Sequence, residues 1–328
     1  MTTHTSTMTN PFSPSPRGAV LPDSNLVGRE ELLIDFWRLI DQASHGKLVP
    51  VIVRANYGGG KTTALKWLTT RLISKGNAPS HMSSKRIFAV YTRLTHPKMS
   101  EVISSFVDGV KLGLGCQERS HLKKAITQAA NIIHEKGLQS EYTLNCLLYA
   151  CCLDSLYSLG YEVIVHFIDE FEAIEELSPE SVRGFLHEFR DFLDEVGERP
   201  LLLGIGCTDE AYRMMEDLHP ALVSRVPVEF QKEADTRLQF TLENALEFVA
   251  NRIGKIGSPN PEEANPYYPF RRDSIEYLYE KTRGNIRTIE QTCYFAIEQF
   301  KVDNQPVTQD RIVKALHSVI RSKTGEEG

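Results

Sequence analysis

The sequence predicts an α/β protein with a doubly wound parallel sheet, followed by an all-helical C-terminal domain. Three observations support this fold class. Short apolar runs rich in β-branched residues alternate with segments of helical periodicity up to about residue 237. One of these runs leads into a glycine cluster that opens a helix, and another ends in two carboxylates. From Thr241 onward the strand signal disappears and only helical segments remain.

The length of 328 residues suggests two domains, since one domain usually takes about 100–200 residues. We expect a flexible tail rich in Ser, Thr and Pro at 1–23, an α/β domain at 24–237, a helical domain at 238–322 and a short tail at 323–328. The composition, with 41% hydrophobic and 24% charged residues, is that of a globular protein.

The net charge of −6 gives the chain no overall positive field that would attract nucleic acid, so DNA binding would need a local basic patch. The six cysteines form no C-x-x-C pair and do not lie at zinc spacing with histidine, which is typical of free thiols in a reducing compartment. The sequence has no signal-peptide pattern and no apolar run long enough to span a bilayer. We therefore expect a soluble, cytoplasmic protein without a membrane partner.

The elements follow in order along the chain. The apolar spacing over Leu32–Ile40 predicts an amphipathic helix before the first strand, and this helix should end near Gly46. Strands are expected at 49–54, 86–94, 161–169, 200–207 and 226–230. Helices of the α/β domain are expected at 62–74, 98–114, 119–136, 141–159 and 178–196. The helical domain should contain helices at 242–255, 272–282, 285–300 and 308–322.

The strongest chemical signal is the segment Ala55-Asn-Tyr-Gly-Gly-Gly-Lys-Thr62 between the first strand and the next helix. It fits the phosphate-binding pattern G-x-x-x-x-G-K-[ST], except that Ala55 replaces the first glycine. Glycines allow backbone N–H groups to curl around phosphate oxygens, a lysine adds positive charge at the β and γ phosphates, and a Thr hydroxyl can bind magnesium. The residues expected to bind the nucleotide here are Tyr57, Gly58, Gly59, Gly60, Lys61, Thr62 and Thr63. The cofactors predicted are ATP and Mg²⁺.

A second signal supports the first. The apolar strand Val163–Ile168 ends in Asp169 and Glu170. In this order after a phosphate loop, we expect Asp169 to hold Mg²⁺ together with Thr62, and Glu170 to orient the water that attacks the γ phosphate. The alternative is two acidic residues at an exposed strand end.

With these motifs, the sequence from about 25 to 322 resembles the AAA+ ATPase superfamily, and within it the initiator-type branch of origin-recognition and replication-initiator ATPases and transposon target-selection ATPases. The resemblance implies a P-loop NTPase core with a helical lid domain. It also implies that Val27 and Arg29, in the segment Val27-Gly-Arg-Glu30, lie beside the adenine.

The same resemblance implies three further catalytic residues. Thr208 ends the fourth strand where the family places a polar sensor of the γ phosphate. Arg225, in Leu222-Val-Ser-Arg-Val226, resembles the arginine that reaches a neighbouring subunit's nucleotide, and Arg287, in Gly284-Asn-Ile-Arg287, resembles the arginine of the lid's second sensor. Each has an alternative interpretation: Thr208 as a helix cap, Arg225 as a surface arginine and Arg287 as an exposed helix residue.

We therefore expect an ATP hydrolase that acts as a nucleotide-dependent switch, assembles as a homo-oligomeric ring or filament, and does so on duplex DNA or on a DNA-bound partner. A local basic stripe in the long helical insertion would provide the DNA contact, although a solvated helix face explains the same charges. The stripe would consist of Lys111, Arg119, Lys123, Lys124 and Lys136. The alternative is an ATPase subunit that gates a separate protein effector, as in a mobile-element or anti-phage system, without touching DNA.

Overall fold

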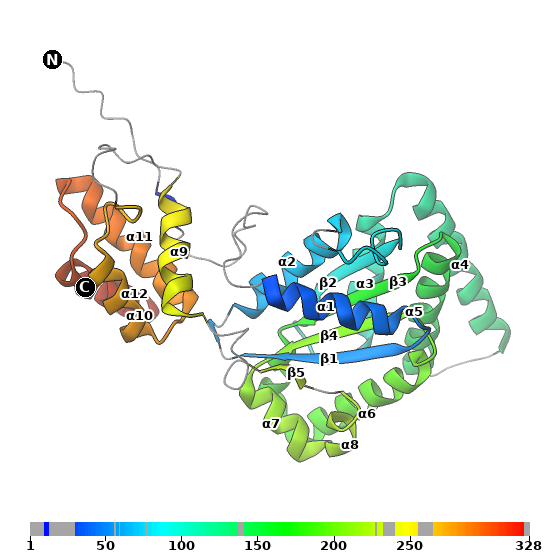
Figure 1. Ribbon diagram of the computed structural model, residues 1–328. Helices are drawn as coiled ribbons and strands as arrows, with labels where there is room; N and C mark the ends of the chain where they lie inside the picture. The colour runs from blue at the N-terminus through cyan, green and yellow to red at the C-terminus, as the bar shows by residue number, and fades with distance from the viewer. Residues whose placement is uncertain are drawn as a thin grey trace. The chain divides into compact units, whose positions relative to one another are not determined.

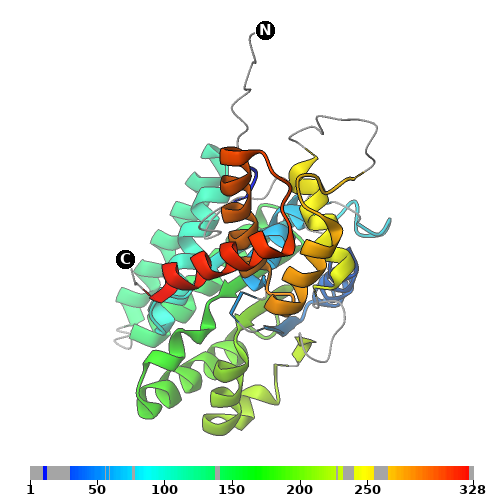
Figure 2. The ribbon, with the colours of Figure 1, turned by 90° about the vertical axis from the view of Figure 1, so that its left-hand side faces the viewer.

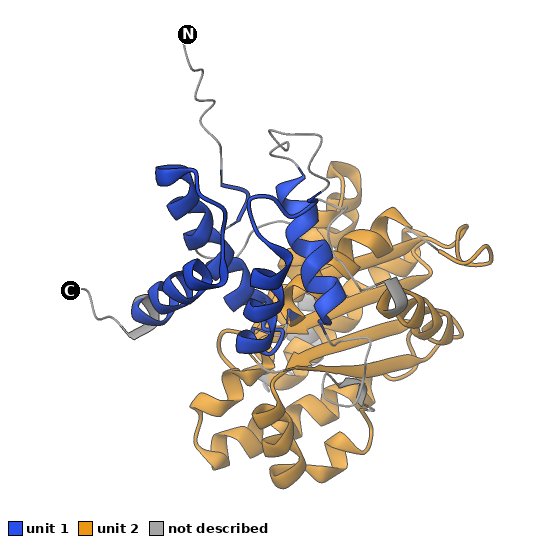
Figure 3. Ribbon diagram, turned by 60° about the vertical axis from the view of Figure 1, so that its left-hand side comes forward, with its two compact units in different colours: residues 1–28, 58–60, 239–328 blue, residues 29–57, 61–238 orange. Residues whose placement is uncertain are grey.

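The computed structural model describes residues 10–12, 30–55, 57–58, 60–75, 78–136, 141–226, 228–231, 240–254 and 265–324. The chain divides into two compact units (Figure 3). An α/β unit consists of residues 29–57 and 61–238, and a helical unit consists of residues 1–28, 58–60 and 239–328. Each unit is described by itself below.

The α/β unit contains a five-stranded sheet in the order β2-β3-β4-β1-β5, and every neighbouring pair of strands is parallel (Figure 1). The strands are β1 (Leu48–Arg54), β2 (Ile87–Arg93), β3 (Val163–Asp169), β4 (Leu201–Cys207) and β5 (Val228–Gln231). The doubly wound parallel sheet predicted from the sequence is confirmed. Because all strands run the same way, their carboxyl ends meet at one edge, where α/β proteins place their ligands.

Helices cover both faces of this sheet. On one face lie α1 (Glu30–Ala43) and α2 (Lys61–Ser74), and on the other lie α3 (Met99–Gly113) and α5 (Glu141–Ser158). Beside α5 pack α4 (Cys116–Lys136) and α6 (Pro179–Val196). The short elements at the carboxyl end of the strands are η1 (Phe171–Glu176), α7 (Asp209–Leu218) and α8 (Pro220–Val223).

The central strand β3 is buried along its whole length, which explains its nearly continuous apolar sequence. Phe167 points toward α1, where its ring lies 5.4 Å from that of Phe36. Gly204 in β4 makes room for this ring, since a Cβ at position 204 would lie 2.5 Å from the Phe167 side chain. Ile164 and Ile168 belong to the core on the other face, with α3, α5 and α6. Successive side chains of β3 thus serve opposite layers.

One polar residue, His166, lies within this buried strand. Each of its ring nitrogens is hydrogen-bonded to a hydroxyl. Nδ1 lies 3.0 Å from the Tyr149 hydroxyl, and Nε2 lies 2.8 Å from the Thr92 hydroxyl. Burial lowers the pKa of His166 to about 3. The imidazole is therefore neutral at physiological pH, and its satisfied hydrogen bonds offset the cost of placing a polar ring in the core.

In the described part of the helical unit, four helices pack around a common core, shown from yellow to red in Figure 2. They are α9 (Leu242–Ile253), α10 (Arg272–Thr282), α11 (Ile286–Asp303) and α12 (Gln309–Thr324). Thr241 begins α9 with a reciprocal capping box with Asn244, and Asn285 caps α11 by accepting a hydrogen bond from the Thr288 N–H. None of the helices in the described part of the chain is both long and apolar enough to cross a membrane.

The N-terminal segment expected to be a flexible tail includes three residues that are packed in the helical unit. Phe12 is only 4% exposed, and its ring lies 6.3 Å from that of Phe248 and 6.0 Å from that of Phe270. The Asn10 side chain donates to the Tyr294 carbonyl at 3.0 Å and to Glu298 at 2.8 Å. The prediction of a flexible tail over 1–23 is therefore wrong for residues 10–12, because an aromatic ring with an apolar site available gains more from burial than the segment loses by ordering.

We predict that Phe12→Ala destabilises the helical unit by about 3 to 5 kcal/mol, the range typical of removing a buried aromatic ring and leaving a cavity. Urea denaturation monitored by circular dichroism measures the change. Val302→Ala in α11 is the control, because Val302 is 87% exposed and should change stability little. A Phe12→Ala midpoint equal to that of the control would show that the ring does not belong to the core.

Candidate nucleotide site

The loop between β1 and α2 has the backbone conformation that a phosphate cradle requires. Gly58 and Gly60 have φ angles of 77° and 85°, in the region that favours glycine. Thr62 and Thr63 are half-buried in the first turn of α2, where free backbone N–H groups and the helix dipole favour an anion. Three residues of the predicted nucleotide site, Val27, Arg29 and Gly59, lie outside the described part of the chain.

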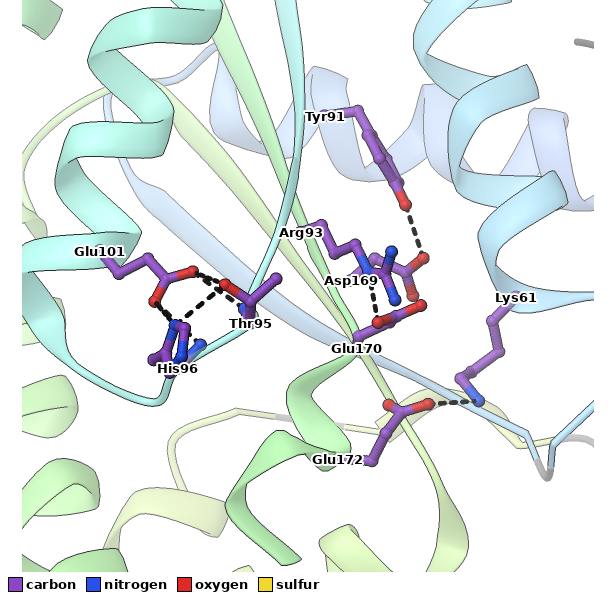
Figure 4. Close-up of polar contacts among 9 residues, drawn as sticks. All are labelled: Lys61, Tyr91, Arg93, Thr95, His96, Glu101, Asp169, Glu170 and Glu172. Carbon is purple, nitrogen blue, oxygen red and sulfur yellow. Dashed lines mark hydrogen bonds and ion pairs between the residues drawn. The ribbon is translucent and has the colours of Figure 1, made fainter. Parts of the chain in front are cut away.

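Lys61 is 7% exposed, so its ammonium group is largely removed from water. Its Nζ donates a hydrogen bond to the Ala55 carbonyl at 2.7 Å and lies 3.4 Å from Oε1 of Glu172 in η1 (Figure 4). The ring of Tyr57, an exposed residue, has its centroid 5.7 Å from the same nitrogen. A single buried cation therefore connects the loop after β1 with the segment after β3.

Asp169 is fully buried at the end of β3, and its two oxygens have different surroundings. Oδ2 accepts a hydrogen bond from the Tyr91 hydroxyl at 2.7 Å. Oδ1 is buried and has no hydrogen-bond partner among the described residues. Leaving a buried carboxylate oxygen unpaired is costly, and a ligand for that oxygen removes the cost. The oxygen atoms of Asp169 and Thr62 fit Mg²⁺, which prefers oxygen ligands from one or two protein side chains and retains waters.

Glu170 has φ 59° and ψ 38°, a left-handed conformation that is uncommon for residues other than glycine. This backbone turns the chain sharply between β3 and η1, so the adjacent carboxylates of Asp169 and Glu170 enter different environments. The Glu170 carboxylate forms an ion pair with Arg93 at the end of β2 (Figure 4). Strained backbone at a cluster of charged side chains is a common feature of functional sites.

The sequence matches no protein-family model and no curated protein. Solved structures do match. The Aeropyrum pernix ORC2 protein in its ADPNP-ADP complexes has a TM-score of 0.63 at 14% identity, over 95% of this chain and 73% of that chain. The Walker-type ATPase PABY2304 of Pyrococcus abyssi has a TM-score of 0.52 at 13% identity, over 90% of this chain and 73% of that chain. This chain shares the fold of these two structures. Drosophila ORC bound to DNA is also similar, with a TM-score of 0.52 at 14% identity, over 94% of this chain and 65% of that one.

Thr208, the predicted sensor, directly follows β4 and is the N-cap of α7. Its hydroxyl oxygen accepts a hydrogen bond from the Ala211 N–H at 3.1 Å and donates its proton to Glu175 of η1. The capping role that the sequence left as an alternative is therefore present. A role of Thr208 toward a γ phosphate stays a prediction, and it would require the hydroxyl to exchange Glu175 for phosphate.

Arg225 lies just after α8 and forms an ion pair with Asp194 of α6 in the same chain. Its side chain is exposed, so this ion pair is solvated and contributes little to stability. The surface interpretation of Arg225 matches this contact. The weak pair nevertheless leaves the guanidinium available to another subunit, and that role stays a prediction.

Arg287 lies in the first turn of α11 in the helical unit, two residues after the Asn285 cap, and is half-buried. The residue is therefore on the helix, as the resemblance implies, and is not fully exposed. Its role as a second sensor stays a prediction.

Three contacts at this site involve residues that sequence reasoning missed: Tyr91, Arg93 and Glu172. In the parallel register, Arg93 pairs with Asp169 and Tyr91 with Phe167, which places both β2 side chains at the carboxyl edge beside Asp169 and Glu170. Polar residues at alternate positions at the end of an apolar strand were the available signal. Glu172 gave none, because acidic residues after a strand are common.

We predict that Thr208→Val destabilises the α/β unit by about 1 to 3 kcal/mol, because it removes the α7 cap and leaves Glu175 without its donor. Thr208→Ser keeps both hydrogen bonds and should remain close to the wild-type protein. Thermal unfolding of the two variants measures the difference. A Thr208→Val protein as stable as the wild type, beside a destabilised Thr208→Ser, would show that the methyl group and not the hydroxyl matters at this position.

Proposed function

We propose that this protein is an AAA+ ATPase that binds ATP with Mg²⁺ and hydrolyses it at the carboxyl edge of the β-sheet. The observation that carries the proposal is the contact between Lys61 and Glu172. This contact brings the phosphate-loop lysine to the segment that directly follows Asp169 and Glu170. A phosphate cradle, an orphaned buried carboxylate oxygen and a second carboxylate are the parts that phosphoryl transfer to water requires.

Each residue has a defined role in this proposal. The backbone N–H groups of the loop and the start of α2 bind the phosphates, and Lys61 neutralises charge on the β and γ phosphates. Thr62 and Asp169 would hold Mg²⁺, which neutralises phosphate charge when bound. Glu170 orients and polarises the attacking water. Since Arg93 now holds the Glu170 carboxylate, this ion pair must open or rearrange before Glu170 can accept a water proton.

We predict that Lys61→Ala weakens ATP binding about 10- to 100-fold, the loss expected for one charge-assisted hydrogen bond of about 1.5–3 kcal/mol. Glu170→Gln should keep ATP affinity and lower turnover by about 10²-fold or more, since it removes only the base. Isothermal titration and phosphate release measure the two effects. Lys124→Ala, at an exposed position of α4, is the control. Wild-type turnover by Glu170→Gln would refute the role assigned to Glu170.

We further propose that ATP binding assembles the protein into an oligomer in which Arg225 reaches the nucleotide of a neighbouring subunit. Two observations support this. Among the described residues, Arg225 is held by a solvated ion pair with Asp194, which a phosphate of higher charge can outcompete. The AAA+ fold, moreover, is shared with the DNA-bound origin-recognition complex of Drosophila.

The proposed DNA contact rests on fewer basic residues than the sequence suggested. Lys111 forms an ion pair with Asp108 at 2.9 Å, and Arg119 donates to the Leu114 carbonyl at 2.8 Å. Lys123 and Lys124 are exposed on α4, while the side chain of Lys136 lies outside the described set. Because Asp108 compensates the charge of Lys111 and the Arg119 side chain is bound to a backbone carbonyl, we favour a DNA-bound partner or a protein effector over direct DNA binding by this stripe.

We predict that the Glu170→Gln protein increases in molar mass when ATP and Mg²⁺ are added, as measured by light scattering. Arg225→Ala should assemble normally but hydrolyse ATP about 10³-fold more slowly, because the trans arginine stabilises charge in the transition state. Adding a short duplex at low salt separates the partner classes: a mass gain that falls steeply with salt indicates DNA. A monomer under every condition would contradict the oligomeric switch.

A further inference from the structure

Glu172 has no role in the site as proposed, yet it is the partner of the essential lysine. It lies in η1, three residues after Asp169, and is 9% exposed. Its Oε1 is 3.4 Å from Lys61 Nζ, and its Oε2 is buried without a hydrogen-bond partner among the described residues. Burial raises the pKa of Glu172, while the charge of Lys61 opposes that rise.

The geometry of the Lys61–Glu172 ion pair is not that of a strongly stabilising pair. A charge-assisted hydrogen bond between ammonium and carboxylate is usually about 2.7–2.9 Å long, and this one is longer. Oε2 of Glu172 has no hydrogen-bond partner among the described residues. In a buried ion pair with such an unsatisfied atom, the attraction between the charges seldom offsets the free energy lost on desolvation. The Glu172 carboxylate is thus buried at a cost in desolvation energy, and it lies beside Lys61, which binds phosphate in the proposed site. This position suggests that Glu172 has a role in nucleotide binding.

We propose that Glu172 is a positioning residue that holds Lys61 at the phosphate loop and competes with the phosphates of a nucleotide for it. The Ala55 carbonyl and Glu172 together fix the ammonium group at the loop before ATP arrives. An incoming phosphate must take Lys61 from Glu172 and must also approach the negative charge of Glu172. Glu172 thereby weakens affinity for ADP as well as ATP, and this favours release of the product. The inference rests on the nucleotide site proposed above.

The test is nucleotide affinity of Glu172→Gln, which removes the charge and keeps the size of the side chain. Removing one negative charge within a few ångströms of the phosphate site should tighten the Kd for ADP and for ATP about tenfold at the effective dielectric of a protein. The KM for ATP should fall while kcat changes less, because Glu172 does not touch the reacting atoms. Titrations of a fluorescent ADP analogue in EDTA report affinity without a contribution from metal binding.

Two matched variants control this experiment. Glu176→Gln removes one negative charge from an exposed position of the same segment η1 and should leave the Kd unchanged. Glu172→Asp keeps the charge and should return the Kd toward the wild-type value. An unchanged or weaker Kd in Glu172→Gln, or an equal gain in Glu176→Gln, would overturn the proposal.

A second measurement does not depend on nucleotide. Lys61→Met, Glu172→Gln and the double variant form a double-mutant cycle in thermal unfolding. If Glu172 holds Lys61, each single variant leaves one buried charge unpaired, so the double variant should unfold at a higher temperature than additivity predicts. Additive effects would overturn the ion pair. If Lys61→Ala bound ATP as the wild-type protein does, the nucleotide site itself would fail, whereas an unchanged Kd in Glu172→Gln beside a defective Lys61→Ala removes only the role of Glu172.

Discussion

The arrangement of the site depends on the burial of one positive charge, the ammonium group of Lys61. A charge taken out of water must be compensated, and here the compensation comes from the Ala55 carbonyl and the Glu172 carboxylate. Ala55 follows β1 and Glu172 follows β3, which are separated in the sheet by β4. The lysine thus links the ends of two strands that do not pair with each other, and it keeps η1 close to the phosphate loop.

The position of η1 in turn explains how two adjacent carboxylates acquire different surroundings. Asp169 is the last residue of β3 and points into the interior, where Tyr91 satisfies one of its oxygens. Glu170 adopts the left-handed conformation that lets the chain turn into η1, and its carboxylate meets Arg93 instead. An ordinary extended residue at position 170 would continue the strand direction and would not bring Glu172 back toward Lys61. The backbone strain at Glu170 and the ion pair of Lys61 are therefore parts of the same arrangement.

Much of this could be predicted from the sequence because it follows from local patterns. Apolar β-branched runs gave all five strands, and the G-x-G-K-T loop and the Asp169-Glu170 pair gave the two halves of the site. The contacts that hold these residues could not be predicted. Arg93 pairs with Glu170 only because β2 and β3 are parallel in one register, and Asp194 meets Arg225 only because α6 packs near α8. Such ion pairs depend on tertiary packing. A single charged side chain produces no periodic pattern in the sequence from which its partner could be predicted.

The N-terminal segment shows the same limit at the level of the domains. Its Ser, Thr and Pro content is typical of a disordered tail, and nothing near Phe12 in the sequence indicates a partner, because Phe248 and Phe270 lie more than two hundred residues later. Burial of this one ring makes residues from both ends of the chain part of the same helical unit. The α/β unit is therefore inserted, in sequence terms, within the chain of the helical unit. The chain passes between the two units four times, at 28/29, 57/58, 60/61 and 238/239. Burial of the Phe12 ring and the two hydrogen bonds of Asn10 offset the conformational entropy that residues 10–12 lose when they are ordered.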